Sequence, residues 1–119
     1  MKTFALPKSE RISGRQALEN LLENGRGGTA GCLRYKVVFT GAEQARIMVS
    51  VPKRQFKRAV KRNLLKRRMR EAYRLQKPSF GADILFVYIS REVLPFQTVY
   101  ADMAAALERL SALKDEQNA

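Results

Sequence analysis

Several residue types that functional sites commonly use are scarce in this chain of 119 residues. It has no histidine, and Cys32 is its only cysteine. This composition excludes an intramolecular disulfide, the usual zinc sites and a histidine general base. No apolar run approaches the roughly 20 residues that span a bilayer, and the first residues lack the apolar core of a signal peptide. We therefore expect a soluble, cytoplasmic protein with no membrane partner.

Acidic residues are also few, and the excess of positive charge is concentrated in one segment. The chain has 23 lysines and arginines against 11 acids, a net charge of +12. Between Lys53 and Arg74 lie 11 of the basic residues and a single acid, Glu71. A concentrated basic surface favours a polyanion, because each neutralised phosphate releases condensed counterions. This pattern predicts a binding surface and does not by itself separate RNA from DNA or an anionic membrane.

The length fits one domain over residues 1–119, and the hydrophobic spacing predicts its elements. In chain order we expect an extended stretch over 1–10, a helix opened by a capping box at Ser13 and Gln16 and ended by Gly25, a flexible connector over 25–31, strands over 33–40 and 46–51, a helix over 55–77, a buried strand over 84–89 and a last helix from Phe96. The tail from about residue 114 is expected to fray. A further early strand or a split one gives the order αβββαβα, an α+β domain with a small sheet packed against helices, or α/β sandwich.

The segment Arg62–Arg74, RNLLKRRMREAYR, carries the clearest functional pattern. At helical spacing Leu65, Met69 and Ala72 share a side that should pack on the sheet. The other side carries the predicted phosphate-binding residues Arg62, Asn63, Lys66, Arg67, Arg70 and Arg74. Arg62 lies at the edge of this set, and Glu71 can pair with Arg67 or Arg74. An ordinary solvated face would mix charges of both signs, and a membrane-surface helix would need larger apolar residues.

Basic residues just before this segment form a second, weaker group. Additional phosphate contacts are predicted from Lys53, Arg54, Lys57 and Lys61. Ordinary surface charge is an open alternative for them. Phe4, near the start of the chain, is expected to pack rather than to touch RNA.

The run SVPKRQFKRAVKRNLLKRRMREAYR, from Ser50 to Arg74, resembles the signature of the bacterial ribonuclease P protein family. That pattern is Arg-Asn-x-x-Lys-Arg-x-x-Arg-Glu-x-x-Arg, and every fixed position is present. The resemblance extends to Phe4-x-Leu6, Lys8, Arg11 and Gly81-x-Asp83-Ile84. It implies a fold with a left-handed crossover between parallel strands, an exception to the usual right-handed rule.

The resemblance also implies partners. The basic helix would contact the catalytic RNA subunit, and a cleft between the first helix and the sheet would hold the 5′ leader of precursor tRNA. Leader-cleft candidates are Leu18, Leu22, Tyr35 and Val37. The family usually carries phenylalanine where this chain has Leu18 and Leu22. Two interpretations of Tyr35 stay open, a cleft aromatic or a core residue of the strand.

Catalysis, in this hypothesis, belongs to the RNA. Mg²⁺ would be bound by the RNA subunit and substrate, with no metal site and no catalytic residue in this chain, because its acids are scattered along the sequence. The main alternative is a non-catalytic protein that binds structured RNA, like a ribosomal protein. A DNA-binding protein is disfavoured because helix-turn-helix spacing is missing, and a protein-only nuclease because carboxylates and histidines do not cluster.

Overall fold

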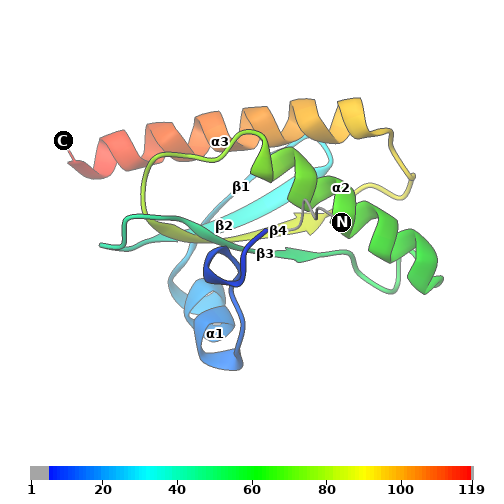
Figure 1. The fold of residues 1–119 in the computed structure, drawn as a ribbon, viewed down its shortest axis with the longest axis horizontal. Coiled ribbons are helices and arrows are strands. Elements are labelled where there is room, and N and C mark those ends of the chain that lie inside the picture. Colours follow the sequence, from blue (N-terminus) through cyan, green and yellow to red (C-terminus); the bar gives the residue numbers. More distant parts are fainter. Residues whose placement is uncertain (1–5, 119) are drawn as a thin grey trace.

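The computed structural model describes residues 6–118, which form one α+β domain (Figure 1). Its elements are the short 3-10 helix η1 (Lys8–Glu10), α1 (Arg15–Asn24), β1 (Arg26–Ala30), β2 (Leu33–Phe39), β3 (Arg46–Ser50), α2 (Ala59–Arg74), β4 (Ala82–Tyr88) and α3 (Phe96–Asn118). The predicted order αβββαβα is confirmed, with η1 in front of it. Phe4, expected to pack, lies outside the described residues.

The four strands form one mixed sheet in the order β1-β2-β4-β3. β4 pairs with β2 in antiparallel fashion and with β3 in parallel. Parallel neighbours need a crossover connection, and α2 supplies it between β3 and β4. Six of the seven β4 residues are buried, as the apolar run predicted for a central strand.

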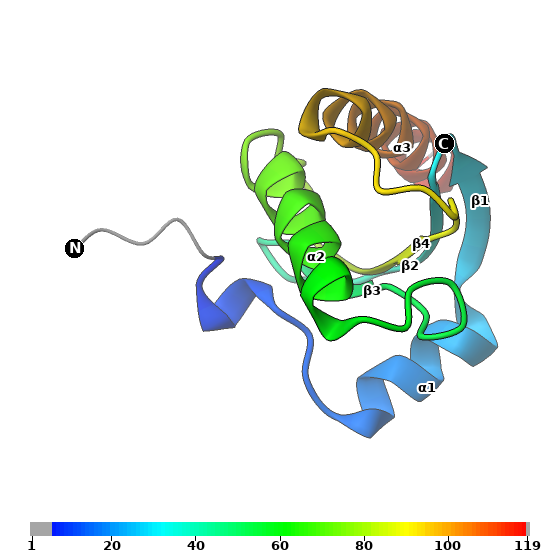
Figure 2. The same cartoon turned by 90° about the vertical axis from the view of Figure 1, so that its right-hand side faces the viewer.

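The two faces of the sheet are covered differently (Figure 2). α2 and α3 cover one side, here called the α2/α3 face, and α1 covers part of the other, the α1 face. The alternation along β2 turns Leu33, Tyr35 and Val37 toward the α2/α3 face, whereas Val38 packs with the cluster beneath α1.

Most of the core lies on the α2/α3 face. Fully buried side chains there include Leu65, Met69, Tyr73, Phe86, Tyr88, Met103 and Leu110. The cluster on the α1 face has three buried members, Ile12, Leu21 and Leu85. Apolar burial at roughly 25 cal/mol per Å² therefore stabilises the domain mainly through the first face.

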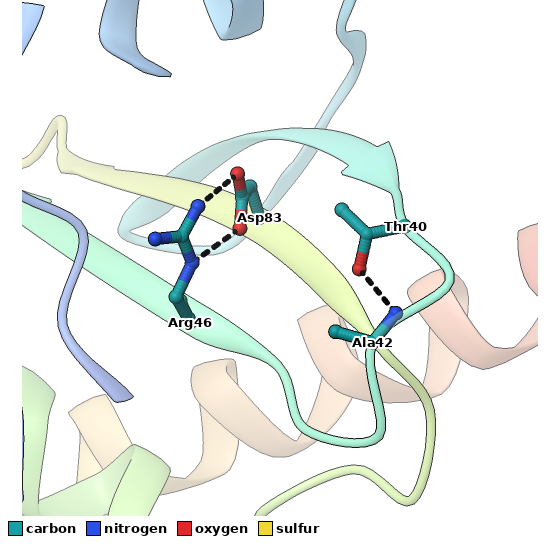
Figure 3. A network of polar contacts seen from close by, with 4 residues as sticks. All are labelled: Thr40, Ala42, Arg46 and Asp83. Carbon is teal, nitrogen blue, oxygen red and sulfur yellow. Dashed lines mark hydrogen bonds and ion pairs between the residues drawn. The ribbon is translucent and has the colours of Figure 1, made fainter. Parts of the chain in front are cut away.

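Polar contacts hold the sheet together where β4 begins (Figure 3). Arg46 of β3 donates from Nε and Nη2 to the two carboxylate oxygens of Asp83 in β4, at 2.9 and 2.8 Å. These two residues are also partners in the strand register. In the adjoining turn the Ala42 amide donates to Thr40 Oγ1 at 3.3 Å. A Cβ on Gly81 would lie 1.9 Å from the Ala42 carbonyl oxygen, so this close approach requires glycine.

The glycine-rich segment predicted as a flexible connector is instead strand β1, and that prediction is wrong. Arg26–Ala30 pairs along its whole length with β2. Glycine is suited here because a Cβ on Gly28 would lie 2.3 Å from the hydroxyl oxygen of Tyr35, the residue opposite. The side chain of Tyr35 thus occupies the space that a side chain on β1 would need.

The ends of the helices also differ from the sequence prediction. α1 is capped by Gly14 (φ 97°) without a side-chain cap, so the capping box at Ser13 is wrong. α2 starts at Ala59 because Gln55 and Phe56 donate their amides to Pro52 O in a preceding turn. α3 extends to Asn118, past residue 114, and Lys114 lies over the Phe39 ring at 5.5 Å.

Candidate RNA interface

One side of α2 packs into the core and the other carries the predicted RNA-binding residues. Leu65, Met69 and Ala72 have no exposed surface, as the helical spacing predicted. We call the set on the other side the docking face: Arg62, Asn63, Lys66, Arg67, Arg70 and Arg74. Asn63 and Arg67 are exposed, and the other four are half-buried. The docking face is therefore accessible to a partner over several turns of the helix.

Two arginines of the docking face are oriented by contacts within the protein. Arg62 donates from Nη1 to the carbonyl oxygens of Phe56 and Lys57, both at 2.8 Å, which ties the start of α2 to the loop before it. Arg74 makes a bidentate ion pair with Glu71, with Nε–Oε1 at 3.0 Å and Nη2–Oε2 at 2.6 Å. The hydrogen bonds from Arg74 lower the pKa of the Glu71 carboxyl. Of the two partners predicted for Glu71, Arg74 is the one it has.

A further arginine joins the docking face from the N-terminal segment. Burial lowers the pKa of the Arg70 guanidinium, and the positive charge of Arg11 lowers it further. The chain at Arg11 is fixed by a parallel bridge to Ile47, and the Ile12 amide donates to Ile47 O at 2.8 Å. Nearby, the Lys77 ammonium and the buried Glu10 carboxylate pair at 2.8 Å. The positive charge of Arg11 therefore adds to that of the docking face, which sequence spacing alone did not reveal.

Arg68 belongs to the other side of α2. Its Nη1 donates to the carbonyl oxygen of Leu94 in the segment before α3. The guanidinium of Arg68 therefore joins two parts of the domain, although it lies within the same basic run. The helical period, and not charge alone, separates the docking face from this contact.

The second basic group lies where β3 passes into α2. Lys53, Arg54, Lys57 and Lys61 are all exposed. Arg54 also lines a hollow of about 500 Å³ at the end of the sheet. The other three extend the positive surface from that hollow to the first turns of α2.

The predicted leader-cleft residues fall on both faces of the sheet. Leu18 of α1 packs against the cluster on the α1 face, and Leu22 is 51% exposed beside it. Tyr35 and Val37 are buried on the α2/α3 face, so their assignment to a cleft beside α1 is wrong, and the core interpretation of Tyr35 is correct. Their odd-numbered positions in β2 point away from α1.

The even-numbered residues of β2 occupy the α1 face instead. Arg34 is exposed, and Lys36 is half-buried with its ammonium donating to the Leu22 carbonyl oxygen at 3.0 Å. The alternation in the sequence defined both sets of residues. The alternation alone does not show which set lies beneath α1, and the structure places the set that contains Arg34 and Lys36 there.

Neither a metal centre nor a membrane span is found in residues 6–118. No three acids or cysteines of this region are grouped so that they could hold a metal ion. None of its helices is both long enough and apolar enough to cross a bilayer.

A basic helix laid on a small sheet, with most of its arginines on the side away from the core, defines an α+β domain suited to binding a polyanion. The family described as "Ribonuclease P" matches residues 6–111. The ribonuclease P protein component of Porphyromonas gingivalis is 38% identical over 96% of both chains. That of Dictyoglomus thermophilum is 32% identical over 98% of this chain and all of its own.

Solved structures agree on the fold. The RNase P protein of Staphylococcus aureus superposes with a TM-score of 0.76 at 19% identity, over 87% of this chain and 96% of that one. The RNase P protein from Thermotoga maritima gives 0.75 at 24% identity, over 84% and 96%. The chain belongs to the bacterial ribonuclease P protein family. It is a component of an RNA-based endoribonuclease for tRNA 5′ maturation, and this membership implies an RNA subunit and precursor tRNA as partners.

Proposed function

We propose that this chain binds the catalytic RNA subunit through the docking face and the 5′ leader of precursor tRNA on the α1 face. The observation that carries the proposal is that α2 has two different sides. Leu65, Met69 and Ala72 on one side are fully buried, and the basic residues of the docking face lie on the other. Arginines one helical turn apart suit the backbone of a structured RNA, where phosphate contacts supply affinity. Arg11 would add a contact beside Arg70.

The α1 face suits a single strand for a different reason. It is only partly covered, and Arg34 and Lys36 bring positive charge beside apolar Val38. The aromatic residues of the central strands, Tyr35, Phe86 and Tyr88, are in the core of the opposite face. Leader binding would therefore depend on charge and shape more than on stacking of bases on aromatic rings.

The chemistry of the reaction would be supplied by RNA. Mg²⁺ needs a cluster of oxygen ligands, and we propose that the RNA subunit and the substrate provide them. In this arrangement the protein orients precursor tRNA and offsets the repulsion between two polyanions. The proposal includes neither DNA nor a membrane as a partner, and the cytoplasm is the proposed place of action.

Reconstitution tests this function directly. Purified protein is mixed with the catalytic RNA subunit at low Mg²⁺, and cleavage of precursor tRNA is compared with the RNA alone. We expect stimulation, because the protein replaces part of the charge neutralisation that Mg²⁺ provides. An Arg67→Ala/Arg70→Ala variant should stimulate less, and duplex DNA should not compete at equal concentration. If the wild-type protein gave no stimulation, the proposal would be wrong.

A further inference from the structure

The segment before α1 passes around one edge of the sheet. β3 is the edge strand on that side, and Figure 2 shows the segment passing it on the way from α2 to α1. Leu6, at one end of the segment, is buried in the core of the α2/α3 face, whereas Ile12, at the other end, belongs to the cluster on the α1 face. Between them, Arg11 pairs with Ile47 of β3. We call residues 6–12 the N-terminal strap.

A buried ion pair joins the N-terminal strap to the end of α2. The Glu10 side chain is 8% exposed, and its Oε1 and Oε2 lie 2.8 and 3.1 Å from Lys77 Nζ, just after α2 ends. The two residues are 67 positions apart in the sequence, so only the fold reveals the pair. The charge of Glu10 also reaches α2 itself, because burial raises the pKa of the Tyr73 hydroxyl and Glu10 raises it further.

This ion pair has a larger effect on where the N-terminal strap lies than on stability. Removing two charges from water costs free energy that offsets much of the gain from pairing them, so a buried pair contributes little net stability. Breaking it is costly, however, because one charge would then remain buried without a partner. The pair therefore keeps Glu10 at the end of α2 and fixes the path of its neighbours.

The neighbour whose position matters for binding is Arg11. It follows Glu10 directly and is exposed, and its positive charge acts on Arg70 of the docking face. Like charges repel, so the two guanidiniums favour a strap that lies farther from α2. The ion pair between Glu10 and Lys77 opposes that movement, because it attaches the strap to the same helix.

We propose that Glu10 and Lys77 are positioning residues that hold Arg11 beside the docking face, where it binds the backbone of the catalytic RNA subunit. This inference rests on the proposed function, because it concerns how the docking face binds RNA. Neither positioning residue needs to contact RNA, since their charges neutralise each other. Holding Arg11 in place before RNA arrives lowers the entropy cost of ordering its segment on binding.

Charge and positioning predict opposite results for Glu10→Gln. This variant removes a negative charge near the docking face, so electrostatics alone would make binding of the RNA subunit tighter. If Glu10 positions Arg11, the variant should instead bind about two- to fivefold more weakly and with a lower salt slope. Affinity of the full-length protein for the catalytic RNA subunit is measured over a range of salt concentrations.

Further variants show whether the effect passes through Arg11. Glu10→Gln/Lys77→Met removes the ion pair at constant net charge and should weaken binding as Glu10→Gln does. Arg11→Gln should weaken binding about two- to tenfold and lower the salt slope by about one unit. Adding Glu10→Gln to Arg11→Gln should cause no further loss, because the charge to be positioned is already missing.

Two controls separate positioning from a change in charge and from a general loss of stability. Glu116→Gln removes one carboxylate from an exposed pair with Arg26, and it should not weaken binding. Val99→Ala removes buried apolar volume from α3, so it should lower the free energy of unfolding and leave the salt slope unchanged.

Hydrogen exchange of the free protein gives a readout that does not depend on RNA. The Ile12 amide donates to Ile47 O at 2.8 Å and reports whether the N-terminal strap stays on β3. It should exchange faster in Glu10→Gln/Lys77→Met than in wild type, because local opening becomes easier. In Glu116→Gln its rate should be unchanged.

The possible failures are distinguishable. If Glu10→Gln binds the RNA subunit at least as tightly as wild type while Arg11→Gln binds more weakly, the ion pair does not position Arg11, and the proposed function stands. The inference is also wrong if Arg11→Gln has no effect, or if adding Glu10→Gln to it causes the full loss again. If Arg67→Ala/Arg70→Ala also left the affinity unchanged, the docking face itself would be wrong and the proposed function would fail.

Discussion

The two faces of the sheet differ in what their residues do. On the α2/α3 face, two helices bury nearly all of the large apolar side chains of the domain. On the α1 face, a short helix covers a cluster with three buried members, and Arg34 and Lys36 lie on the same face. The contrast suggests that stability is concentrated on one face, so that the other can remain open and charged for a polyanion.

The largest expected effect comes from opening a cavity on the α2/α3 face. Phe86→Ala removes a fully buried ring that contacts the Tyr73 ring at a centroid distance of 6.3 Å. Urea unfolding should show a loss of about 3 to 5 kcal/mol. The matched change on the α1 face is Leu22→Ala, at a side chain 51% exposed, and it should cost less than about 1 kcal/mol. Equal losses would contradict the division between the faces.

The two sides of α2 sharpen the same comparison within one helix. Arg67→Ala and Arg70→Ala should each weaken binding of the RNA subunit about tenfold and lower the salt slope by about one unit, because each removes a phosphate contact. Arg68→Ala is the control, since Arg68 donates to Leu94 O on the core side. It should reduce the free energy of unfolding and leave the salt slope unchanged. If Arg68→Ala lowered the salt slope of RNA binding, Arg68 would also contact phosphate, and the docking face would include it.

A smaller effect is expected at the polar contact between β3 and β4. Asp83→Asn breaks the bidentate pair with Arg46, whose side chain is 44% exposed while that of Asp83 is 11% exposed. Solvent around Arg46 weakens the pair, so we expect a loss of only about 1 kcal/mol in thermal unfolding. Arg26→Gln, at an exposed pair with Glu116, should lie within about 0.5 kcal/mol of wild type. If Arg26→Gln reduced the free energy of unfolding more than Asp83→Asn did, the exposed ion pair would stabilise the fold more than the half-buried one.

The smallest effect is a dependence on pH at the docking face. Arg74 lowers the pKa of Glu71 in the folded protein, so this carboxylate stabilises the fold above its unfolded pKa of about 4.3. That contribution is lost as the pH falls through the lowered pKa. Glu71→Gln should therefore flatten the acid side of the stability profile slightly in a series of melts below about pH 5. Identical profiles would mean that the pair contributes nothing to stability.

Helical periodicity within α2 alone is enough to predict which of its residues form the docking face. The residues that border the cleft depend in addition on which face of the sheet α1 covers. Leu65, Met69 and Ala72 identify the buried side of α2 from spacing alone, so the opposite side follows. Along β2 the period of two defines two sets of residues, but the position of α1 decides which set borders the cleft. Tyr35 has a ring that could stack on a base, but that ring is buried in the core. The glycines of β1 do not match the β-branched and aromatic pattern that predicts a strand. Gly28 is suited to this strand because the Tyr35 side chain of β2 occupies the space that a side chain there would need.

The strand order also bears on how the protein is made. β4 lies between β2 and β3 but is the last strand to be synthesised, so the sheet cannot close while the nascent chain ends before it. Until then β3 lacks its neighbouring strand, and the basic α2 leaves the ribosome ahead of α3, the other helix on its face. Domains with such long-range pairings fold slowly, because chain entropy is lost before the contacts form. During translation, the apolar side of α2 therefore stays exposed until β4 and α3 have been made, and exposed apolar surface of this kind favours aggregation.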